Sequence, residues 1–234
     1  MEHIKYKNKI IEYEIIIRKI KNVYIQIKEG KVIVKAPKRV TKKAVSEIVL
    51  SKAPWIINKL ENPNQVKPKE IKYEQGEIFK ILGQNQVLNI EYKECLKTEV
   101  CLDNNILNVY FPLKYKTELT KEQRKEIIKS GINKIYIAVA RKEYYKIIQQ
   151  LTKRTGLSPT KWRIRDIKTA WGSCSSKKSI TLSLNLIKYK PEIIEYVIMH
   201  ELCHLKHMNH SKEFWSLVEK YIPEYKTYRK ELKS

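Results

Sequence analysis

The sequence contains little of what marks fibrous, disordered or disulfide-bonded proteins. Only 6 of its 234 residues are glycine and 8 are proline, which excludes a collagen-like or low-complexity chain. No stretch approaches the about 20 consecutive apolar residues that a membrane span needs, and the charged start contains no apolar signal-peptide region. The four cysteines form no Cys-x-x-Cys pair, and their scarcity favours a reduced, cytoplasmic compartment.

Acidic residues are few beside basic ones. Lysine and arginine total 48 and aspartate and glutamate 25, which gives a net charge of +23 and a pI near 9.7. Such a charge suits nucleic acid, because neutralising phosphates releases counterions. However, 40 of the basic residues are lysines spread along the whole chain, whereas phosphate-binding patches favour the planar fork of arginine. Nucleic acid is therefore an alternative partner of the basic surface, and a lysine-rich composition is the simpler explanation.

Apolar residues are frequent enough to form a core, and their spacing divides the chain. They make up 42% of the sequence, which excludes a mostly disordered chain. In the first half they alternate with polar residues or form short runs, as strands do. Beyond Glu118 they recur at helical spacing as far as Lys153, and Gly156 ends the pattern. We predict an α+β fold with a strand-rich region, residues 1–115, of unassigned function, and a region with a long helix and a small sheet, residues 116–234.

Individual elements follow from the same patterns and from capping residues. Val23, Ile25 and Ile27 alternate with polar residues before a glycine turn, which predicts a hairpin over 23–36. Thr41 can cap a helix that Pro54 interrupts. The best linker candidate is the stretch 62–68, which contains two prolines. Further strands are predicted at 13–17, 78–82, 87–92, 99–102, 106–111, 162–167 and 179–184, and a further helix begins at Pro191.

The chemistry is concentrated in one short segment. Four of the five histidines fall between His200 and His210, and the first five residues read His-Glu-Leu-Cys-His. Two histidines four residues apart on a helix project from one face, so His200 and His204 can bind one zinc ion. Glu201 can reach a zinc-bound water, whose pKa the metal lowers to about 7, and act as its base. The motif predicts one catalytic zinc per chain.

The third ligand has more than one candidate. A continuing helix would place His207 near the same face, whereas His210 can reach the metal only if the helix stops before it. Asn209 provides such a stop, since asparagine tolerates the left-handed conformation, and Ser211 can cap a new helix. A related long zinc motif has glycine at position 207, which this chain lacks. We favour His210 as the ligand, with His207 supporting the site or facing solvent, and Glu213 as a weaker alternative.

Several strings around the motif resemble one known family. They are Trp171–Cys174, Tyr196–Ser211, Phe214–Trp215, Arg163–Asp166, Lys35–Pro37 and Lys52–Ile56. They resemble the YgjP-like metallopeptidases, bacterial and archaeal relatives of the SprT-like and WLM zinc proteases within the zincins. The resemblance implies a zincin-like catalytic half in residues 116–234, with the HExxH motif on a helix beside a small sheet and metal held by His200, His204 and His210. Ala170 departs from the family, which commonly has arginine there.

Other residues near the motif are candidates for substrate binding. Tyr196 precedes His200 by four residues and could donate a hydrogen bond to an oxyanion, although a core position is the more common role for tyrosine. Arg163 and Arg165 alternate with apolar Ile164, which suggests a strand with one polar face. In zincins an edge strand beside the metal helix often receives the substrate backbone. Cys174 and Cys203 are expected to pack as small apolar residues.

Three functions are compatible with the motif. The first is a zinc-dependent endopeptidase acting on a protein or peptide substrate, with a zinc-bound water activated by Glu201. The second is a metal-dependent hydrolase of phosphate anhydrides or nucleotides, for which the positive charge would attract substrate. The third is a nucleic-acid-binding module with a structural zinc. A single histidine-rich metal site favours amide hydrolysis, and a structural site needs no carboxylate at Glu201.

Overall fold

The computed structural model describes residues 1–61 and 71–232. Its elements form a mixed α+β fold that divides into two compact units, Met1–Glu70 and Ile71–Ser234. The predicted linker at 62–68 lies outside the described residues. The predicted boundary at 115/116 differs from this division, because residues 78–112 share one hydrophobic core with the helices that follow them. The structure therefore assigns the second strand-rich segment to the larger unit.

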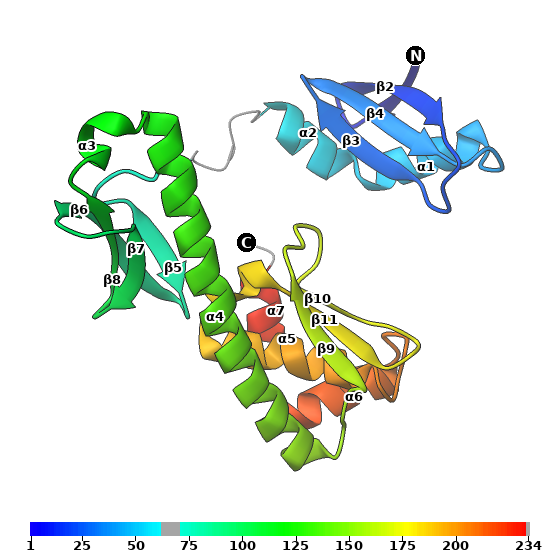
Figure 1. The fold of residues 1–234 in the computed structure, drawn as a ribbon. Coiled ribbons are helices and arrows are strands. Elements are labelled where there is room, and N and C mark those ends of the chain that lie inside the picture. Colours follow the sequence, from blue (N-terminus) through cyan, green and yellow to red (C-terminus); the bar gives the residue numbers. More distant parts are fainter. Residues whose placement is uncertain (62–70, 233–234) are drawn as a thin grey trace. The chain divides into compact units, whose positions relative to one another are not determined.

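The first unit is a four-stranded sheet followed by two helices (Figure 1). Strand β2 (Lys9–Ile17) forms a hairpin with β1 (Glu2–Tyr6), β4 (Lys31–Ala36) forms one with β3 (Tyr24–Lys28), and β2 and β4 pair in parallel. The predicted hairpin over 23–36 is confirmed. Helix α1 (Lys42–Ser51) begins as predicted at Thr41, whose side chain accepts a hydrogen bond from the Ala44 N–H at 3.2 Å. Helix α2 (Ala53–Glu61) follows.

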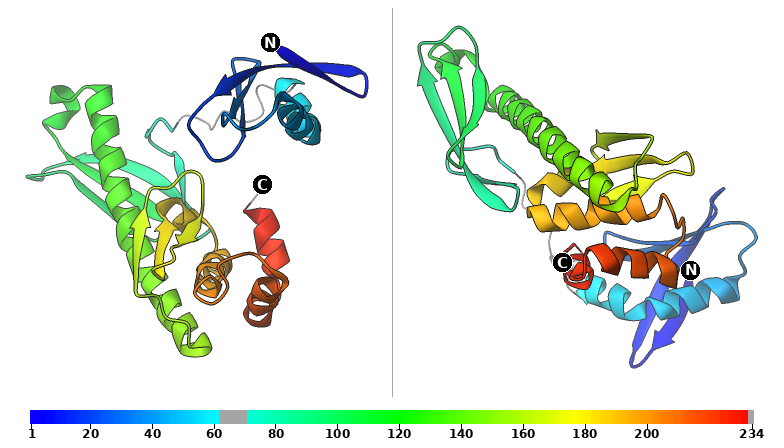
Figure 2. Two further views of the ribbon diagram at one scale, coloured as in Figure 1. Left: turned by 90° about the vertical axis from the view of Figure 1, so that its right-hand side faces the viewer. Right: turned by 90° about the horizontal axis from the view of Figure 1, so that it is seen from below.

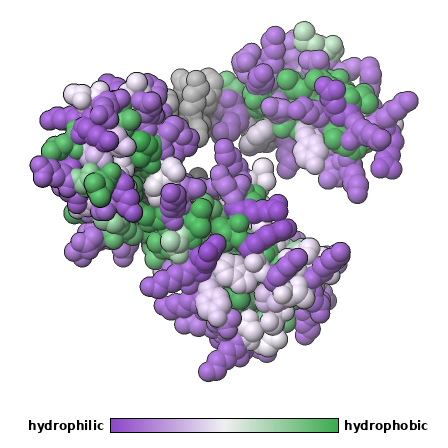
Figure 3. Space-filling model, in the orientation of Figure 1, coloured by the Kyte–Doolittle hydropathy of each residue, from purple (hydrophilic) through white to green (hydrophobic). Residues whose placement is uncertain are grey.

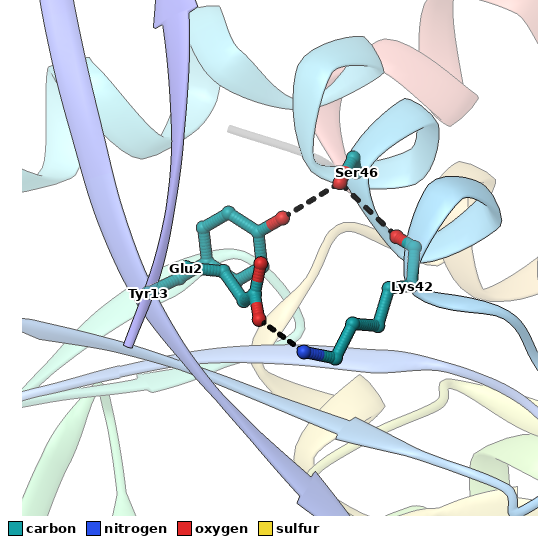
Figure 4. A network of polar contacts seen from close by, with 4 residues as sticks. All are labelled: Glu2, Tyr13, Lys42 and Ser46. Atoms are coloured by element: carbon teal, nitrogen blue, oxygen red, sulfur yellow. Dashed lines mark hydrogen bonds and ion pairs between the residues drawn. The ribbon is translucent and has the colours of Figure 1, made fainter.

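Polar contacts fix α1 of the first unit on its sheet (Figure 4). The Tyr13 hydroxyl lies 2.9 Å from Ser46 Oγ, and the Ser46 hydroxyl donates a hydrogen bond to the Lys42 carbonyl at 3.0 Å. Lys42 Nζ in turn donates to Glu2 at 2.7 Å. Beneath these contacts, apolar side chains close a core that is separate from that of the second unit: Ile11, Tyr13, Val32, Val34, Ala36, Val45, Val49, Ala53 and Ile56. Because it has its own core, the first unit can be expected to fold by itself.

The second unit begins with another four-stranded sheet. Its strands are β5 (Ile78–Ile81), β6 (Gln84–Lys93), β7 (Glu99–Asp103) and β8 (Ile106–Pro112), in the order β5-β6-β8-β7. Two antiparallel hairpins are again joined by a central parallel pair, so the order repeats that of the first sheet, β1-β2-β4-β3. The short helix α3 (Tyr115–Glu118) leads to the long helix α4 (Lys121–Thr155). Gly156 ends α4 as predicted, with a φ of 72°.

A third, small sheet and three helices complete the second unit. The strands β9 (Lys161–Arg165), β10 (Gly172–Cys174) and β11 (Ser179–Ser183) lie in the order β10-β11-β9. A 3-10 turn, η1 (Leu184–Lys188), leads to α5 (Pro191–Cys203), which is followed by α6 (Lys212–Tyr221) and α7 (Tyr225–Glu231). Helix α5 lies between α4 on one side and α6 and α7 on the other (Figure 2). This packing fixes the helix that carries the histidine motif.

Hydrogen bonds from α4 stabilise the packing of this helix against β11, α5 and α6. The Tyr144 hydroxyl is buried and donates to the Ser183 carbonyl at 3.0 Å, at the end of β11. Arg154 contacts both Glu195 of α5 at 3.0 Å and the Tyr221 carbonyl of α6 at 3.3 Å.

Hydrophilic residues cover most of the face shown in Figure 3. Among the described helices, none combines the length and the apolar character that crossing a bilayer requires.

Candidate metal centre

The histidine segment begins on α5 and leaves it before His210. Helix α5 ends at Cys203, with His204 as its C-cap, and α6 begins after Ser211, whose hydroxyl accepts a hydrogen bond from the Phe214 N–H. A break between His204 and His210 is therefore confirmed. Its predicted position was wrong, since the helix ends before Asn209 and Asn209 has no positive φ. The chain turns back directly after the second histidine of the motif.

This turn brings three imidazoles together. One ring nitrogen each from His200, His204 and His210 lie within 4.8 Å of one another, and the Nε2 atoms of His200 and His210 are 3.0 Å apart. The His207 ring is not part of the cluster. Its backbone carbonyl instead lies 3.0 Å from His204 Nδ1 and can accept a hydrogen bond from it. Position 207 thus supports a candidate ligand through its main chain.

The chemistry of these donors fits a divalent metal. Burial lowers the pKa of His200 to about 3, helped by repulsion from His204 and His210, and burial also lowers the pKa of His210. Both rings are therefore neutral at neutral pH, the form that binds metals. A proton on His204 Nδ1 leaves the Nε2 lone pair free. Nitrogen donors of this kind suit zinc.

Aromatic side chains of α6 support the three imidazoles. Phe214 is fully buried, and its ring centroid lies 4.9 Å from that of His200, 4.5 Å from His204 and 4.8 Å from His210. Trp215 stacks on His210 with centroids 5.5 Å apart and planes 26° from parallel. The sequence placed Phe214 and Trp215 in a string that resembles the family, but it did not reveal that Phe214 packs against all three rings. The one sequence feature that pointed to this packing was the four-residue spacing from His210 to Phe214.

Glu201 lies beside the cluster in an apolar environment. It is 5% exposed, and its Oε2 atom has no hydrogen-bond partner among the described residues. Burial raises the pKa of its carboxyl group to about 8. Gly172 of β10 packs against this carboxyl group, since a Cβ built there would lie 2.7 Å from Glu201 Oε1. Sequence reasoning missed this role of Gly172, although the residue belongs to the string that resembles the family.

Glu201 and His200 open onto a cavity of about 230 Å³. Tyr196 is buried in the core, the role that the sequence favoured, and it also lines this cavity, where its ring packs against His200 with centroids 6.1 Å apart. Arg229 of α7 also lines it, and no sequence pattern pointed to this residue. A larger cavity of about 580 Å³ between β7 and α4 contains neither histidine nor cysteine. The remaining residues that line the smaller cavity are Trp171, Gly172, Val197 and Leu232.

The predicted arginines of β9 lie elsewhere. Strand β11 separates β9 from β10, and β10 is the edge strand that contacts α5. Arg163 donates to Thr181 Oγ1 at 3.1 Å, and neither Arg163 nor Arg165 lines the cavity. The structure therefore does not bring these two residues to the centre.

The remaining candidates have packing or capping environments. Cys203 is buried, which raises the pKa of its thiol to about 12, and burial raises the pKa of Cys174 as well. Glu213, the weaker alternative for a third ligand, hydrogen-bonds with Ser211, and this contact lowers the pKa of its carboxyl group. It is not part of the histidine cluster.

Comparison with known proteins assigns the chain to a family. A model of the YgjP-like metallopeptidase domain matches residues 21–234. The chain belongs to the YgjP-like metallopeptidase family. Its membership makes this protein a metal-dependent peptidase that acts on proteins or peptides, and it gives no support to nucleic acid as a partner.

One solved structure shows a partial likeness. The crystal structure of the metallopeptidase zymogen of Pyrococcus abyssi abylysin is 28% identical, with 38% of this chain and 90% of that chain covered. The TM-score is 0.36, which does not define a common fold. No curated protein matches the sequence.

Proposed function

We propose that this YgjP-like protein is a zinc-dependent endopeptidase. His200, His204 and His210 would hold one zinc ion per chain, and Glu201 would act as the general base. The observation that supports this most strongly is the juxtaposition of three imidazole nitrogens within 4.8 Å and a buried carboxylate oxygen that has no hydrogen-bond partner in residues 1–61 and 71–232. Buried polar atoms without partners are rare in folded proteins, and a catalytic role is one of the reasons for them.

Bound zinc would polarise the scissile carbonyl and lower the pKa of a water molecule. Glu201 would accept a proton from that water as its oxygen bonds to the carbonyl carbon. The same carboxyl group would then deliver the proton to the amide nitrogen, so that the C–N bond breaks and an amine leaves. Burial of Glu201 favours this second step, because it raises the pKa of the carboxyl group. A cation at the neighbouring histidines would favour the ionised form needed for the first.

The catalytic region, the role of Tyr196 and the location of the protein are proposed on the same basis. We place the peptidase chemistry in residues 116–234, with a zincin-like arrangement of α5, its HExxH motif and the small sheet β9–β11. Tyr196 lines the cavity beside His200 and could donate to the carbonyl oxygen of the substrate. All four cysteines are free, which supports a cytoplasmic location.

The alternatives fit the site less well. Hydrolysis of phosphate anhydrides usually employs carboxylate-bound magnesium or paired metals, whereas the described cluster contains three histidines and no carboxylate ligand. A structural zinc would leave both the buried Glu201 and its cavity without a role. We therefore retain peptide hydrolysis as the single proposed function.

The replacement of Glu201 by glutamine tests the proposal. Glu201→Gln keeps the size of the side chain and removes the base. It should retain one equivalent of zinc by metal analysis while hydrolysis of an unfolded protein substrate falls by about 10²–10⁴-fold. Glu192→Gln, at an exposed position in the first turn of the same helix, is the matched control and should leave both quantities unchanged. Full activity of Glu201→Gln with zinc bound would refute the mechanism.

A further inference from the structure

Arg229 lies at the metal centre although it is far from the motif in sequence. Helix α7 places it on the wall of the cavity that His200 and Glu201 also line. Its guanidinium carbon lies 4.7 Å from the centroid of the Trp215 ring, and that ring stacks on His210. One indole thus connects Arg229 to the histidine cluster, and the position of the guanidinium is fixed relative to the candidate ligands.

This contact leaves the hydrogen-bond donors of Arg229 available. Stacking uses the flat face of a guanidinium, while its N–H groups project from the edge. Within residues 1–61 and 71–232, no carboxylate forms an ion pair with Arg229. Arg229 is exposed to solvent, and its fork matches a carboxylate in two parallel hydrogen bonds. The side chain is therefore held by its stacked face, while its donors remain open to an anion that enters the cavity.

The composition of the cavity points to the missing partner. Among the described residues that line it, Arg229 is the single cation and Glu201, which we assign to the reaction, is the single carboxylate. The other walls include the apolar side chains of Trp171, Val197 and Leu232. At about 230 Å³ the cavity is smaller than the about 300–1,000 Å³ typical of drug-sized ligands. Such a space suits one side chain or one chain end that carries a negative charge.

We infer that Arg229 binds a carboxylate of the substrate beside the scissile bond and thereby determines specificity. This inference rests on the proposed peptidase function. The carboxylate can come from an aspartate or glutamate side chain within the peptide, as in an endopeptidase, or from the C-terminus, in which case cleavage would occur at the end of the chain. In either case the guanidinium would keep its face on Trp215 and donate two hydrogen bonds from its edge. Binding energy obtained there would orient the peptide relative to Glu201.

A purely structural role for Arg229 makes a different prediction. If the side chain only packed on Trp215, its loss would affect stability but would not change the relative rates of acidic and neutral peptides. The net charge of +23 attracts acidic peptides in general, and this attraction would survive the loss of one cation. The experiment therefore needs a control variant that removes a different positive charge. Lys230 provides the matched control, because it is an exposed cation next to Arg229 on α7 and does not line the cavity.

The test uses the zinc-loaded full chain and quenched peptides that differ at one residue beside the cleaved bond. That residue is glutamate or glutamine, and each peptide is made with a free or an amidated C-terminus. We expect the wild type to prefer one carboxylate-bearing peptide by about tenfold or more in kcat/KM, mainly through KM. Arg229→Gln should abolish the preference, Lys230→Gln should retain it, and zinc content should be the same in all three. Loss of the preference on changing glutamate to glutamine would identify a side-chain carboxylate as the partner. Loss of the preference on amidation would identify the C-terminus.

Several results would overturn the inference. They are equal rates for all peptides with the wild type, an unchanged preference in Arg229→Gln, or an equal loss in Lys230→Gln. If Arg229→Gln does not fold, Arg229→Lys replaces it and should weaken the preference, since lysine lacks the bidentate fork. An unchanged preference in that variant counts against the inference.

A binding arm separates this inference from the proposed function. Calorimetry with the zinc-loaded Glu201→Gln variant measures the affinity for the same peptides without cleavage. If the wild type cleaves no peptide, the peptidase proposal fails. A preference for the carboxylate peptide that disappears in the Glu201→Gln/Arg229→Gln double variant would still support the role of Arg229. Equal affinities would exclude it.

Discussion

Gly172 and Glu201 fit together so closely that position 172 has no room for a β-carbon. A Cβ there would lie 2.7 Å from Glu201 Oε1 and 2.8 Å from its Cγ. Gly172 has no positive φ, so the requirement concerns space rather than backbone conformation. The edge strand β10 thus forms one wall of the position that the buried carboxyl group occupies.

This contact predicts that Gly172→Ala reduces activity while zinc stays bound. The methyl group would push the Glu201 carboxyl group away from its place beside the histidines, and a displacement of about 1 Å can cost about 10²-fold in rate. Kinetics on a peptide substrate, together with metal analysis, would measure this. Ser173→Ala, at the exposed next position of β10, should behave like the wild type. Normal activity of Gly172→Ala would show that the carboxyl group need not lie where the structure has it.

The histidines predict an order of zinc affinities. His210→Ala removes a ring of the cluster and should weaken zinc binding by more than about 100-fold, beyond the effect typical of supporting residues. His207→Ala should change the affinity little, because position 207 contacts His204 through its carbonyl. Competition with a chromogenic chelator would measure both constants. Equal losses would mean that the His207 ring takes part in binding.

Phe214 is expected to stabilise the fold as well as the position of the three imidazoles. Its ring is fully buried against three imidazoles, so Phe214→Ala should lower the free energy of unfolding by about 3–5 kcal/mol. Phe214→Leu fills more of the space and should cost less. Urea unfolding in the presence of a chelator would separate this effect from that of zinc. A loss below about 1 kcal/mol for the alanine variant would contradict the packing.

The two units predict where the chain can be shortened. A fragment of residues 71–234 retains the whole core of the second unit and should fold and bind zinc. A fragment of residues 116–234 lacks the sheet β5–β8 and exposes the part of α4 that packs on it. It should therefore unfold at a lower temperature or aggregate. Circular dichroism and metal analysis of both fragments would decide between the boundaries at 70/71 and 115/116.

Local features of this protein could be predicted because neighbouring residues determine them. Thr41 caps α1 through a residue three positions away, and Gly156 ends α4 through its own backbone freedom. The four-residue spacing of His200 and His204 follows from the period of one helix. The break before His210 was also predictable, since the third imidazole could not otherwise reach the others.

Contacts between distant segments could not be obtained in this way. Nothing near Gly172 in sequence specifies that its α-carbon will face Glu201, and nothing near Arg229 specifies its position over Trp215. Both result from the packing of α5 between β10 on one side and α6 and α7 on the other. The boundary at 115/116 differed from the structural division for a related reason. The change from strand to helix is a local pattern, whereas a core joins elements of both kinds.

The shared order of strands in β1–β4 and β5–β8 bears on how such a chain can evolve. The first sheet closes its core with its own helices α1 and α2, so a substitution inside that core is accommodated by these elements alone. The second sheet shares its core with α4 and, through α4, with the metal helix. Substitutions in the second sheet must therefore preserve the packing of the metal helix, whereas those in the first sheet affect a separate core.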